Sequence, residues 1–492
     1  MSITPAQKCA VLALVGGWGA LQNLYRLDAA NWAGDELTYR STGWEYVHGD
    51  FSHNFDHPFT GKLVLGLGQL LLGRDQAQVR IVPAVASLLT GVLLYALIRR
   101  EAGFAAGVTA LGAWLVLPHS APGLPVRIDR FGMLEPILTL FVLATVYAGW
   151  RWHRSGATRW AVATGAAAGL AVTTKATGAL VVPVVFLVVV ATRRGARLVA
   201  QLSLAAAVGL LVSISSYAVA GGRGAHAVEY MVAKQTAHHV GGHLVEIAGR
   251  PYVHPPWWAH LWFQTESYGR PVTAVIAVLA LIGLTARPRA LALLLLGAVI
   301  APLAALSGLL GFALPFYYLV WQPALMGLVA LGVGVLCRAN LAARALVPLA
   351  LAPMLVLAAA TTTELLRLQP SGYDLLAETP LLGAVGSRGD VVLVLGDADR
   401  VATFFDPGQP VLTWIPRGAR VAAIVVDCAF ARRHPRSPVL VHVAQRRTRL
   451  AAAHVDDLLV YVPRSATAVT APASHAHCAR SRDGTVRAEP RR

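Results

Sequence analysis

Charged residues are scarce in this 492-residue chain, where they make up only 14% of the sequence. Soluble globular domains carry about 25% charged residues. Hydrophobic residues account for 56% of the chain, and its mean hydropathy is +0.56. These values exclude an ordinary soluble globular domain and predict a membrane protein.

Cysteine is also rare, with four residues in the whole chain: Cys9, Cys337, Cys428 and Cys478. Their spacing contains no CxxC pair or other pattern typical of a metal site. Cys428 and Cys478 share the C-terminal tail, and they are the one pair that we consider for a disulfide bond.

Lysine is nearly absent, so arginine supplies most of the positive charge behind the net charge of +17. A basic chain can bind nucleic-acid phosphates. Many of these arginines, however, lie in short segments between apolar runs, and positive short loops mark the cytoplasmic side of membrane proteins. The charge distribution therefore argues against nucleic acid as a partner and predicts contact with membrane lipids.

Apolar runs close to the roughly 20 residues needed to cross a bilayer recur along most of the chain. We predict an all-α polytopic membrane domain over residues 1–363. Its eleven spans are expected at residues 9–25, 78–98, 103–118, 131–150, 160–174, 177–192, 198–219, 271–286, 290–308, 316–336 and 345–363. The arginines between the spans place the N-terminus in the cytoplasm, which leaves nearly all acidic residues on the extracytoplasmic side.

The tail after residue 363 alternates short apolar runs with Gly, Pro, Asp and Arg, a pattern typical of β-strands. The runs are "DVVLVLG", "RVAAIVV", "SPVLVHV" and "DLLVYV". We expect a small extracytoplasmic domain, α/β or β-rich, over residues 364–465. Residues 466–492 are rich in Ala, Ser, Arg and His, and we expect them to be disordered.

Two carboxylates, Asp35 and Glu36, stand side by side in "GDELTYR", just after the first span. Ionisable residues at the boundary of a span are usually functional or paired, and a solvated loop is the alternative. The same outer segment contains "HPFTGKLVLGLGQLLLGR", whose leucine spacing predicts an amphipathic helix along the outer leaflet. Further ionisable side chains of this face are Asp56, His57 and Lys62 in "FDHPFTGK", and Arg127, Asp129, Arg130 and Glu135 in "PVRIDRFGMLEP".

Four motifs, in this order and with this topology, resemble the protein O-mannosyltransferases and the lipid-A aminoarabinose transferases, a glycosyltransferase family 39-like group with the GT-C fold. The resemblance covers roughly residues 8–220. The matching positions are Asp35, Glu36 and Tyr39; "FDHPFTGK"; Arg130, Glu135 and Pro136; and "GLAVTTKATG" around Lys175. The second motif departs from the family pattern, because Asp56 directly precedes His57 and Phe59 replaces a proline.

The resemblance implies transfer of one sugar from a polyprenyl-phosphate donor to a hydroxyl acceptor. Phosphate is a good leaving group that needs a cation more than a proton, so one general base is enough. We choose Asp35 as this base, as the resemblance also implies. Glu36 is expected to orient Asp35 or bind the acceptor, and Glu135 to shape the sugar pocket.

The donor phosphate requires positive charge, which Arg supplies in a bidentate way and Lys as a point charge. The candidates are Arg130, Lys62, Arg127 and Lys175. Contact with lipid headgroups is the alternative role for these side chains. The substrate-binding candidates are Tyr39, Asp56, His57 and Tyr318, and Tyr317 is also placed to reach the donor.

Six histidines and three tryptophans crowd residues 226–262. Histidine is a common zinc ligand, but these spacings match no standard site such as HExxH. A divalent metal is thus a possible cofactor for which the sequence identifies no ligands. The tryptophans are predicted to lie at the membrane interface, and an aromatic wall for a sugar or lipid is the alternative.

Mannose transferred to Ser or Thr of proteins is the leading reaction by resemblance, and lipid or cell-wall glycan remains an alternative acceptor. A transporter or flippase of lipid-linked sugars would need an inverted repeat or polar groups through the middle of several spans. Neither is evident in the sequence. A non-catalytic membrane scaffold is the third alternative, but it leaves the acids and bases of the outer face unexplained.

Overall fold

The computed structural model describes residues 4–28, 35–120, 126–192, 194–241, 245–248, 250–309 and 313–368, together with strands in the tail. The chain divides into two compact units. One consists of Met1–Leu27 and Ala33–Leu368, and the other of Asp28–Trp32 and Gln369–Arg492. The domain boundaries expected at residues 363 and 465 remain predictions.

The described part of the first unit consists mainly of helices, with one small pair of strands. Its helices are α1 (Pro5–Leu24), α2 (Glu36–Val47), α3 (Thr60–Leu72), α4 (Gln76–Ala102), α5 (Phe104–Leu115), α6 (Glu135–Ser155), α7 (Thr158–Thr174), α8 (Val182–Thr192), α9 (Ala196–Ala218), α10 (Arg223–Gly241), α11 (Ala259–Gly283), α12 (Arg289–Ala304), α13 (Gln322–Arg338) and α14 (Leu341–Arg367). Short helical turns are η1 (Ile128–Arg130), η2 (Ala176–Val181), η3 (Ala305–Leu309) and η4 (Tyr317–Val320), and the strands are β1 (Val245–Ile247) and β2 (Arg250–Tyr252).

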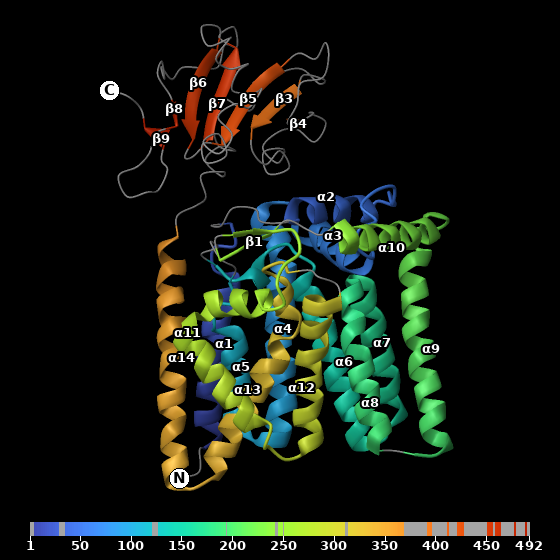
Figure 1. Ribbon diagram of the computed structural model, residues 1–492, viewed down its shortest axis with the longest axis vertical. Helices are drawn as coiled ribbons and strands as arrows, with labels where there is room; N and C mark the ends of the chain where they lie inside the picture. Colours follow the sequence, from blue (N-terminus) through green and yellow to red (C-terminus); the bar gives the residue numbers. More distant parts are fainter. Residues whose placement is uncertain are drawn as a thin grey trace. The chain divides into compact units, whose positions relative to one another are not determined.

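The long helices of this unit stand side by side as an upright bundle, and α2, α3 and α10 lie across one end of it (Figure 1). We call this end the capped end. The N-terminus of the chain lies at the opposite end. Each predicted span overlaps one of the upright helices, with α11 bent at Gly269, whose φ is 72°.

Four helices of the described residues are long and apolar enough to cross a membrane: Gln76–Ala102, Ala196–Ala218, Arg289–Gly308 and Leu341–Arg367. This confirms a helical, multi-pass membrane protein. The number of eleven crossings stays a prediction.

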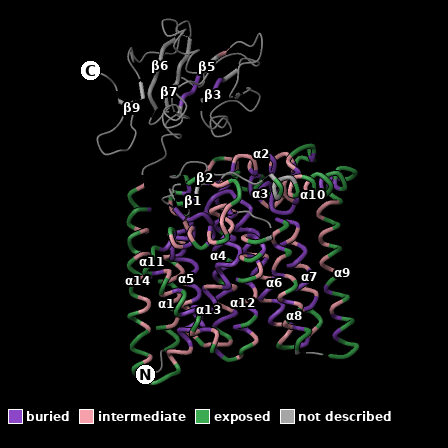
Figure 2. The backbone as a smooth tube through the Cα atoms, viewed as in Figure 1, coloured by how far each residue is buried: buried purple, intermediate pink, exposed green. Residues whose placement is uncertain are grey.

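The bundle has an apolar interior and an apolar outer surface. Trp114, Leu94 and Met326 are fully buried between helices, whereas Leu211 of α9 and Leu349 of α14 are 64% and 69% exposed. Figure 2 shows buried residues concentrated in the inner helices and exposed residues along α9 and α14. Apolar side chains on the outside are what a surrounding of lipid requires.

Helix α3 is amphipathic, as its sequence predicts. It buries Thr60, Lys62 and Leu65, while Leu67 and Leu71 are 54% and 84% exposed. The helix lies across the capped end (Figure 1), and its position along the outer leaflet remains a prediction.

Helices α2 and α3 pack against each other through two glycines. A Cβ atom added to Gly66 would lie 2.0 Å from the carbonyl oxygen of Gly43, and one added to Gly43 would lie 2.7 Å from the carbonyl oxygen of Lys62. Small residues allow such close contact between helix backbones. This contact holds α2, whose N-terminal end carries Asp35 and Glu36, against α3.

The second unit contains a five-stranded mixed sheet in the order β4-β3-β5-β7-β6. Its strands are β3 (Val391–Leu395), β4 (Val411–Leu412), β5 (Val421–Asp427), β6 (Leu450–Val455) and β7 (Leu458–Pro463). Strand β3 pairs in parallel with β4 and β5, and β7 pairs antiparallel with β5 and β6. A separate pair joins β8 (His477–Cys478) and β9 (Ala488–Glu489).

Three of the four apolar runs of the tail coincide with β3, β5 and β7. The fourth run, "SPVLVHV" at residues 437–443, lies outside the described residues, as does Cys428 of the expected disulfide. The class of this domain, α/β or β-rich, stays a prediction. The disorder expected for residues 466–492 also stays a prediction.

The glycine contact between α2 and α3 predicts that Gly66→Ala destabilises the protein by about 1–3 kcal/mol, because the added methyl group must push the helix backbones apart. The melting temperature of the detergent-purified protein measures this effect. The matched control is Gly17→Ala in α1, where no atom lies within 4 Å of the added Cβ. Equal melting temperatures for the two variants would contradict the prediction.

Candidate active site

Asp35 is an exposed carboxylate at the start of α2. The Tyr39 hydroxyl, one helical turn further on, donates a hydrogen bond of 3.1 Å to Asp35 Oδ2. Burial raises the pKa of Tyr39 well above its usual range, and the nearby charges of Asp35 and Glu135 raise it further. Tyr39 therefore stays protonated and remains a donor to Asp35.

His57 lies beside this pair, with its ring centroid 6.1 Å from that of Tyr39. The two sequence motifs "GDELTYR" and "FDHPFTGK" thus meet at Tyr39 and His57.

Glu36 faces the protein interior instead. Its carboxylate accepts two hydrogen bonds from Arg80 of α4, at 2.9 Å and 2.7 Å, and one from the backbone N–H of Gly132. Both side chains of this ion pair are at most 1% exposed. Glu36 therefore joins α2, α4 and the start of the loop before α6, and its role in catalysis stays a prediction.

Glu135 and Lys175 form a second buried ion pair. Glu135 is the first residue of α6, Lys175 directly follows α7, and Lys175 Nζ donates to Glu135 Oε1. The other carboxylate oxygen, Glu135 Oε2, is buried and has no hydrogen-bond partner. An unpaired buried oxygen is unfavourable, so this atom is available to a hydroxyl group of a substrate.

Tyr317 completes this group. Lys175 Nζ lies 4.2 Å from the centre of the Tyr317 ring and 5.7 Å from that of Phe316. The charges of Asp35 and Glu135 both influence Lys175 and Tyr317, so electrostatic interactions link the four side chains. We call Asp35, Tyr39, Glu135, Lys175 and Tyr317 the acid–lysine cluster.

Arg127 has no donor left for a phosphate. Its five N–H groups donate to both carboxylate oxygens of Asp129 and to the backbone carbonyls of Trp114, Leu115 and Leu117. The side chain is buried. Arg127 is therefore a structural residue that holds the end of α5 against η1.

Arg130 also bonds to backbone carbonyls. It donates to the carbonyl oxygens of Gln22, Tyr25 and Arg26 at the end of α1. These carbonyls have no partner within the helix, and a basic side chain satisfies them favourably. The structure thus uses Arg130 to cap α1, and Lys175 is the cation that accompanies Asp35 in the acid–lysine cluster.

Lys62 and Asp56 lie in a different group of contacts. Lys62 Nζ donates to Asn54 Oδ1 at 3.0 Å and also to the Asn54 carbonyl, and Asp56 pairs with Lys234 of α10. Burial lowers the pKa of Lys62 to about 7, and the charge of Asp56 opposes this shift.

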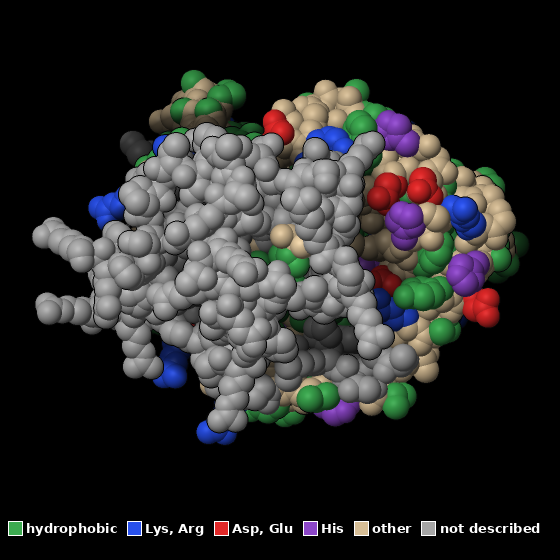
Figure 3. Space-filling model, turned by 90° about the horizontal axis from the view of Figure 1, so that it is seen from above, with side chains coloured by type: hydrophobic (Ala, Val, Ile, Leu, Met, Phe, Trp, Pro, Cys, Tyr) green, Lys and Arg blue, Asp and Glu red, His purple; other side chains and the backbone are tan. Residues whose placement is uncertain are grey.

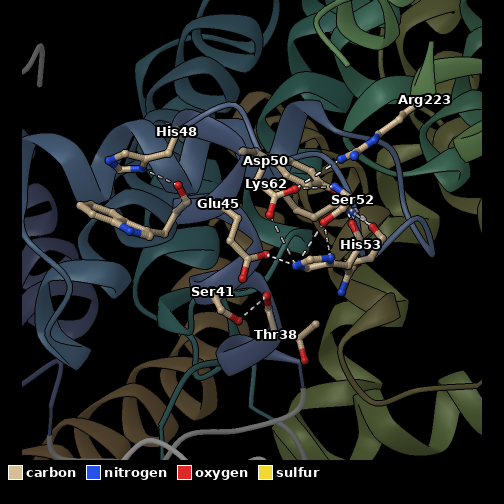
Figure 4. Close-up of polar contacts among 12 residues, drawn as sticks. Thr38, Ser41, Glu45, His48, Asp50, Ser52, His53, Lys62 and Arg223 are labelled. Atoms are coloured by element: carbon tan, nitrogen blue, oxygen red, sulfur yellow. Dashed lines mark hydrogen bonds and ion pairs between the residues drawn. The ribbon is translucent and has the colours of Figure 1, made fainter. Parts of the chain in front are cut away.

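Nearby, His53 contacts the Glu45 carboxylate and Arg223 pairs with Asp50, each at 3.4 Å (Figure 4). Solvent-exposed pairs of this kind contribute little to stability. Figure 3, in which the capped end faces the viewer, shows acidic, basic and histidine side chains close together on its visible part.

Tyr318 is fully buried and has partners outside the cluster. Its hydroxyl donates to the Ser120 carbonyl at 2.7 Å and contacts Ser267 Oγ at 3.1 Å. Of the two adjacent tyrosines, Tyr317 is the one at the acid–lysine cluster.

The structure thus brings together Asp35, Tyr39, His57, Glu135 and Lys175 of the predicted site. Sequence reasoning missed Arg80, the partner of Glu36. A signal was present, because Arg80 is a charge within an apolar run, and such a residue needs a partner. The partners Asn54 and Lys234 had no comparable signal.

No three His, Cys, Asp or Glu side chains are grouped as a metal ion requires within the parts of the chain that the structure describes. Of the histidines in residues 226–262, His243 lies outside the described residues.

Comparison with known proteins identifies the fold. ArnT from Cupriavidus metallidurans bound to undecaprenyl phosphate superposes with a TM-score of 0.65 at 16% identity, over 95% of this chain and 99% of that chain. The Archaeoglobus fulgidus oligosaccharyltransferase in its apo form gives a TM-score of 0.57 at 13% identity, over 86% and 70%. The chain has the GT-C glycosyltransferase fold. This confirms the GT-C fold that the four sequence motifs predict.

Residues 56–218 match the family of dolichyl-phosphate-mannose-protein mannosyltransferases. The undecaprenyl phosphate-alpha-4-amino-4-deoxy-L-arabinose arabinosyl transferase 1 of Proteus mirabilis is 33% identical over 130 residues. This match covers 24% of the present GT-C chain and 22% of that relative. The matched family and the Proteus mirabilis relative are both glycosyltransferases.

The Glu36–Arg80 pair predicts that Glu36→Gln destabilises the protein by about 3–5 kcal/mol, because the buried Arg80 loses the carboxylate with which it forms an ion pair. Chemical or thermal unfolding in detergent measures the loss. A double variant, Glu36→Gln with Arg80→Met, is expected to recover part of it. Asp35→Asn serves as the control and should unfold like the wild type. A Glu36→Gln variant as stable as this control would refute the role of the pair.

The lowered pKa of Lys62 predicts a pH dependence of stability. Between about pH 7 and pH 10.5 the folded protein releases a proton that the unfolded chain keeps, so stability rises with pH in this window. The rise cannot exceed about 1.4 kcal/mol per pH unit. Melting temperatures of wild type and Lys62→Met between pH 7 and 9 test this. The melting temperature of the wild type should rise more with pH than that of the variant. Equal rises in the two proteins would contradict the lowered pKa of Lys62.

Proposed function

We propose that this protein transfers a sugar from a polyprenyl-phosphate donor to a hydroxyl acceptor, with Asp35 as general base. One observation carries the proposal. An exposed carboxylate, Asp35, interacts electrostatically with a buried lysine–glutamate pair at the capped end of a GT-C bundle.

Asp35 suits the acceptor side of the reaction. Its carboxylate is accessible, and the hydrogen bond from Tyr39 limits its orientation. The acceptor hydroxyl gives its proton to Asp35 while its oxygen attacks the anomeric carbon of the sugar. A positioned base of this kind contributes about 10²–10⁴-fold to the rate.

Lys175 and Glu135 suit the donor side. As the bond between the anomeric carbon and the phosphate oxygen breaks, polyprenyl phosphate leaves with an additional negative charge. The ammonium group of Lys175 stabilises that charge, and no proton donor to the leaving group is needed. Glu135 Oε2, buried and without a hydrogen-bond partner, accepts a hydrogen bond from a sugar hydroxyl.

The comparisons support a lipid-phosphate donor in general. ArnT binds undecaprenyl phosphate, and the matched family uses dolichyl-phosphate-mannose. Mannose is our first choice of sugar because of the match over residues 56–218. Protein Ser or Thr is our first acceptor, with lipid or cell-wall glycan as the alternative.

The arginine distribution supports an extracytoplasmic site. Arg99 and Arg100 lie in the last turn of α4, Arg154 in that of α6 and Arg338 in that of α13. These ends are opposite the capped end (Figure 1). Because positive residues favour the cytoplasmic side, the capped end and the acid–lysine cluster would face outward.

Asp35→Asn is expected to reduce sugar transfer at least 100-fold without loss of stability, because it removes the proton acceptor and keeps the shape of the side chain. Membranes containing each variant are incubated with radiolabelled polyprenyl-phosphate mannose, and transfer to acceptor is measured.

Glu266→Gln is the matched control, since Glu266 is another exposed carboxylate on α11. It should retain wild-type transfer. Undiminished transfer by Asp35→Asn would exclude Asp35 as the base. Transfer from other polyprenyl-phosphate sugars but not from the mannose donor would reject the choice of sugar alone.

A further inference from the structure

The two adjacent tyrosines of η4 contact different partners. Tyr317 contacts Lys175 in the acid–lysine cluster. Tyr318 is fully buried and bonds to Ser120 and Ser267. The second tyrosine therefore fixes the backbone that presents the first.

Tyr318 is part of a hydrogen-bonded group that joins distant segments of the chain. The backbone N–H of Ser120 donates to Ser267 Oγ at 2.9 Å, and Ser120 forms a β-bridge with Arg127. In the neighbouring positions, the His119 ring is hydrogen-bonded to the Tyr268 hydroxyl. The group thus connects the end of α5, the strand-like segment before η1, and α11 just before its bend at Gly269.

Helix η4 has little means of holding its own conformation. It is a 3₁₀ helix of four residues, and such helices have poor hydrogen-bond geometry. The Tyr318 hydroxyl ties it to a framework in which Arg127 uses all five donors. Without this tie, the Tyr317 ring would lose its fixed place against Lys175.

We propose that Tyr318 is a positioning residue: through its hydrogen bonds to Ser120 and Ser267 it holds Tyr317 against Lys175, where the leaving phosphate is stabilised. This rests on the proposed function for its catalytic consequence. The sequence predicts Tyr318 as a substrate-binding residue. In this proposal, Tyr318 instead holds Tyr317 in place and does not contact the substrate.

The structural half of the proposal is tested without any activity. Hydrogen–deuterium exchange is measured on wild type, Tyr318→Phe and Ser267→Ala in detergent. Both variants should exchange faster at residues 317–320 and leave α6 and α7 unchanged. Tyr147→Phe, which removes a hydroxyl bonded to Arg151 elsewhere in α6, is the control. Unchanged exchange at residues 317–320 in Ser267→Ala and in any folded Tyr318→Phe would overturn the proposal.

The catalytic half is tested by a double-mutant cycle on the transfer rate with Tyr317→Ala, Tyr318→Phe and the double variant. Tyr318→Phe alone should lower transfer about tenfold, the loss expected from two hydrogen bonds. In the Tyr317→Ala background it should have no further effect, because the group that it positions is gone.

Two independent, multiplicative losses would mean a general structural role and would overturn the proposal. Ser267→Ala replaces Tyr318→Phe in the cycle if the latter does not fold. If the wild type transfers no sugar from any polyprenyl-phosphate donor, the proposed function fails. The exchange result still decides whether Tyr318 positions Tyr317.

Discussion

The buried ion pair between Glu36 and Arg80 is the interaction on which the site depends. It fastens the first residue of α2 to α4 and, through Gly132, to the loop that leads into α6. A charge in this environment requires a full set of partners, so both side chains have one orientation. Asp35, the preceding residue, is thereby left at the edge of the protein with its carboxylate exposed. Two adjacent acids of the same chemistry thus have opposite roles, one structural and one available for reaction.

The other charges near the capped end follow the same principle. Arg127 is neutralised by Asp129 and saturated by carbonyls, and Arg130 caps α1. Burying a charge is costly unless hydrogen bonds and countercharges compensate it. Lys175 is paired as well, but its partner Glu135 keeps one oxygen without a hydrogen bond. This oxygen without a partner supports the proposal that a polar substrate binds at the Lys175–Glu135 pair.

Much of the fold was predictable because its signals are local. Hydrophobic runs of bilayer length define the upright helices, and the leucine spacing of residues 60–72 defines amphipathic α3. The tail is similar, since its alternating runs coincide with β3, β5 and β7. The order of the acidic and basic motifs also led to the GT-C fold, which the comparison with ArnT confirms.

The sequence by itself determined the class of protein, the helices and the set of ionisable residues from which a site could be built. The tertiary structure decided which of these residues meet. It buried Glu36 and left Asp35 exposed, and it placed Tyr317 against Lys175. Tyr318 has other partners. Asp35 interacts electrostatically with Lys175, whereas Arg130 bonds to carbonyls at the end of α1. Helix formation depends on neighbours along the chain, whereas the pairing of buried charges depends on contacts such as Glu36–Arg80, 44 positions apart. No local pattern encodes such a contact, because it exists only once the helices have packed.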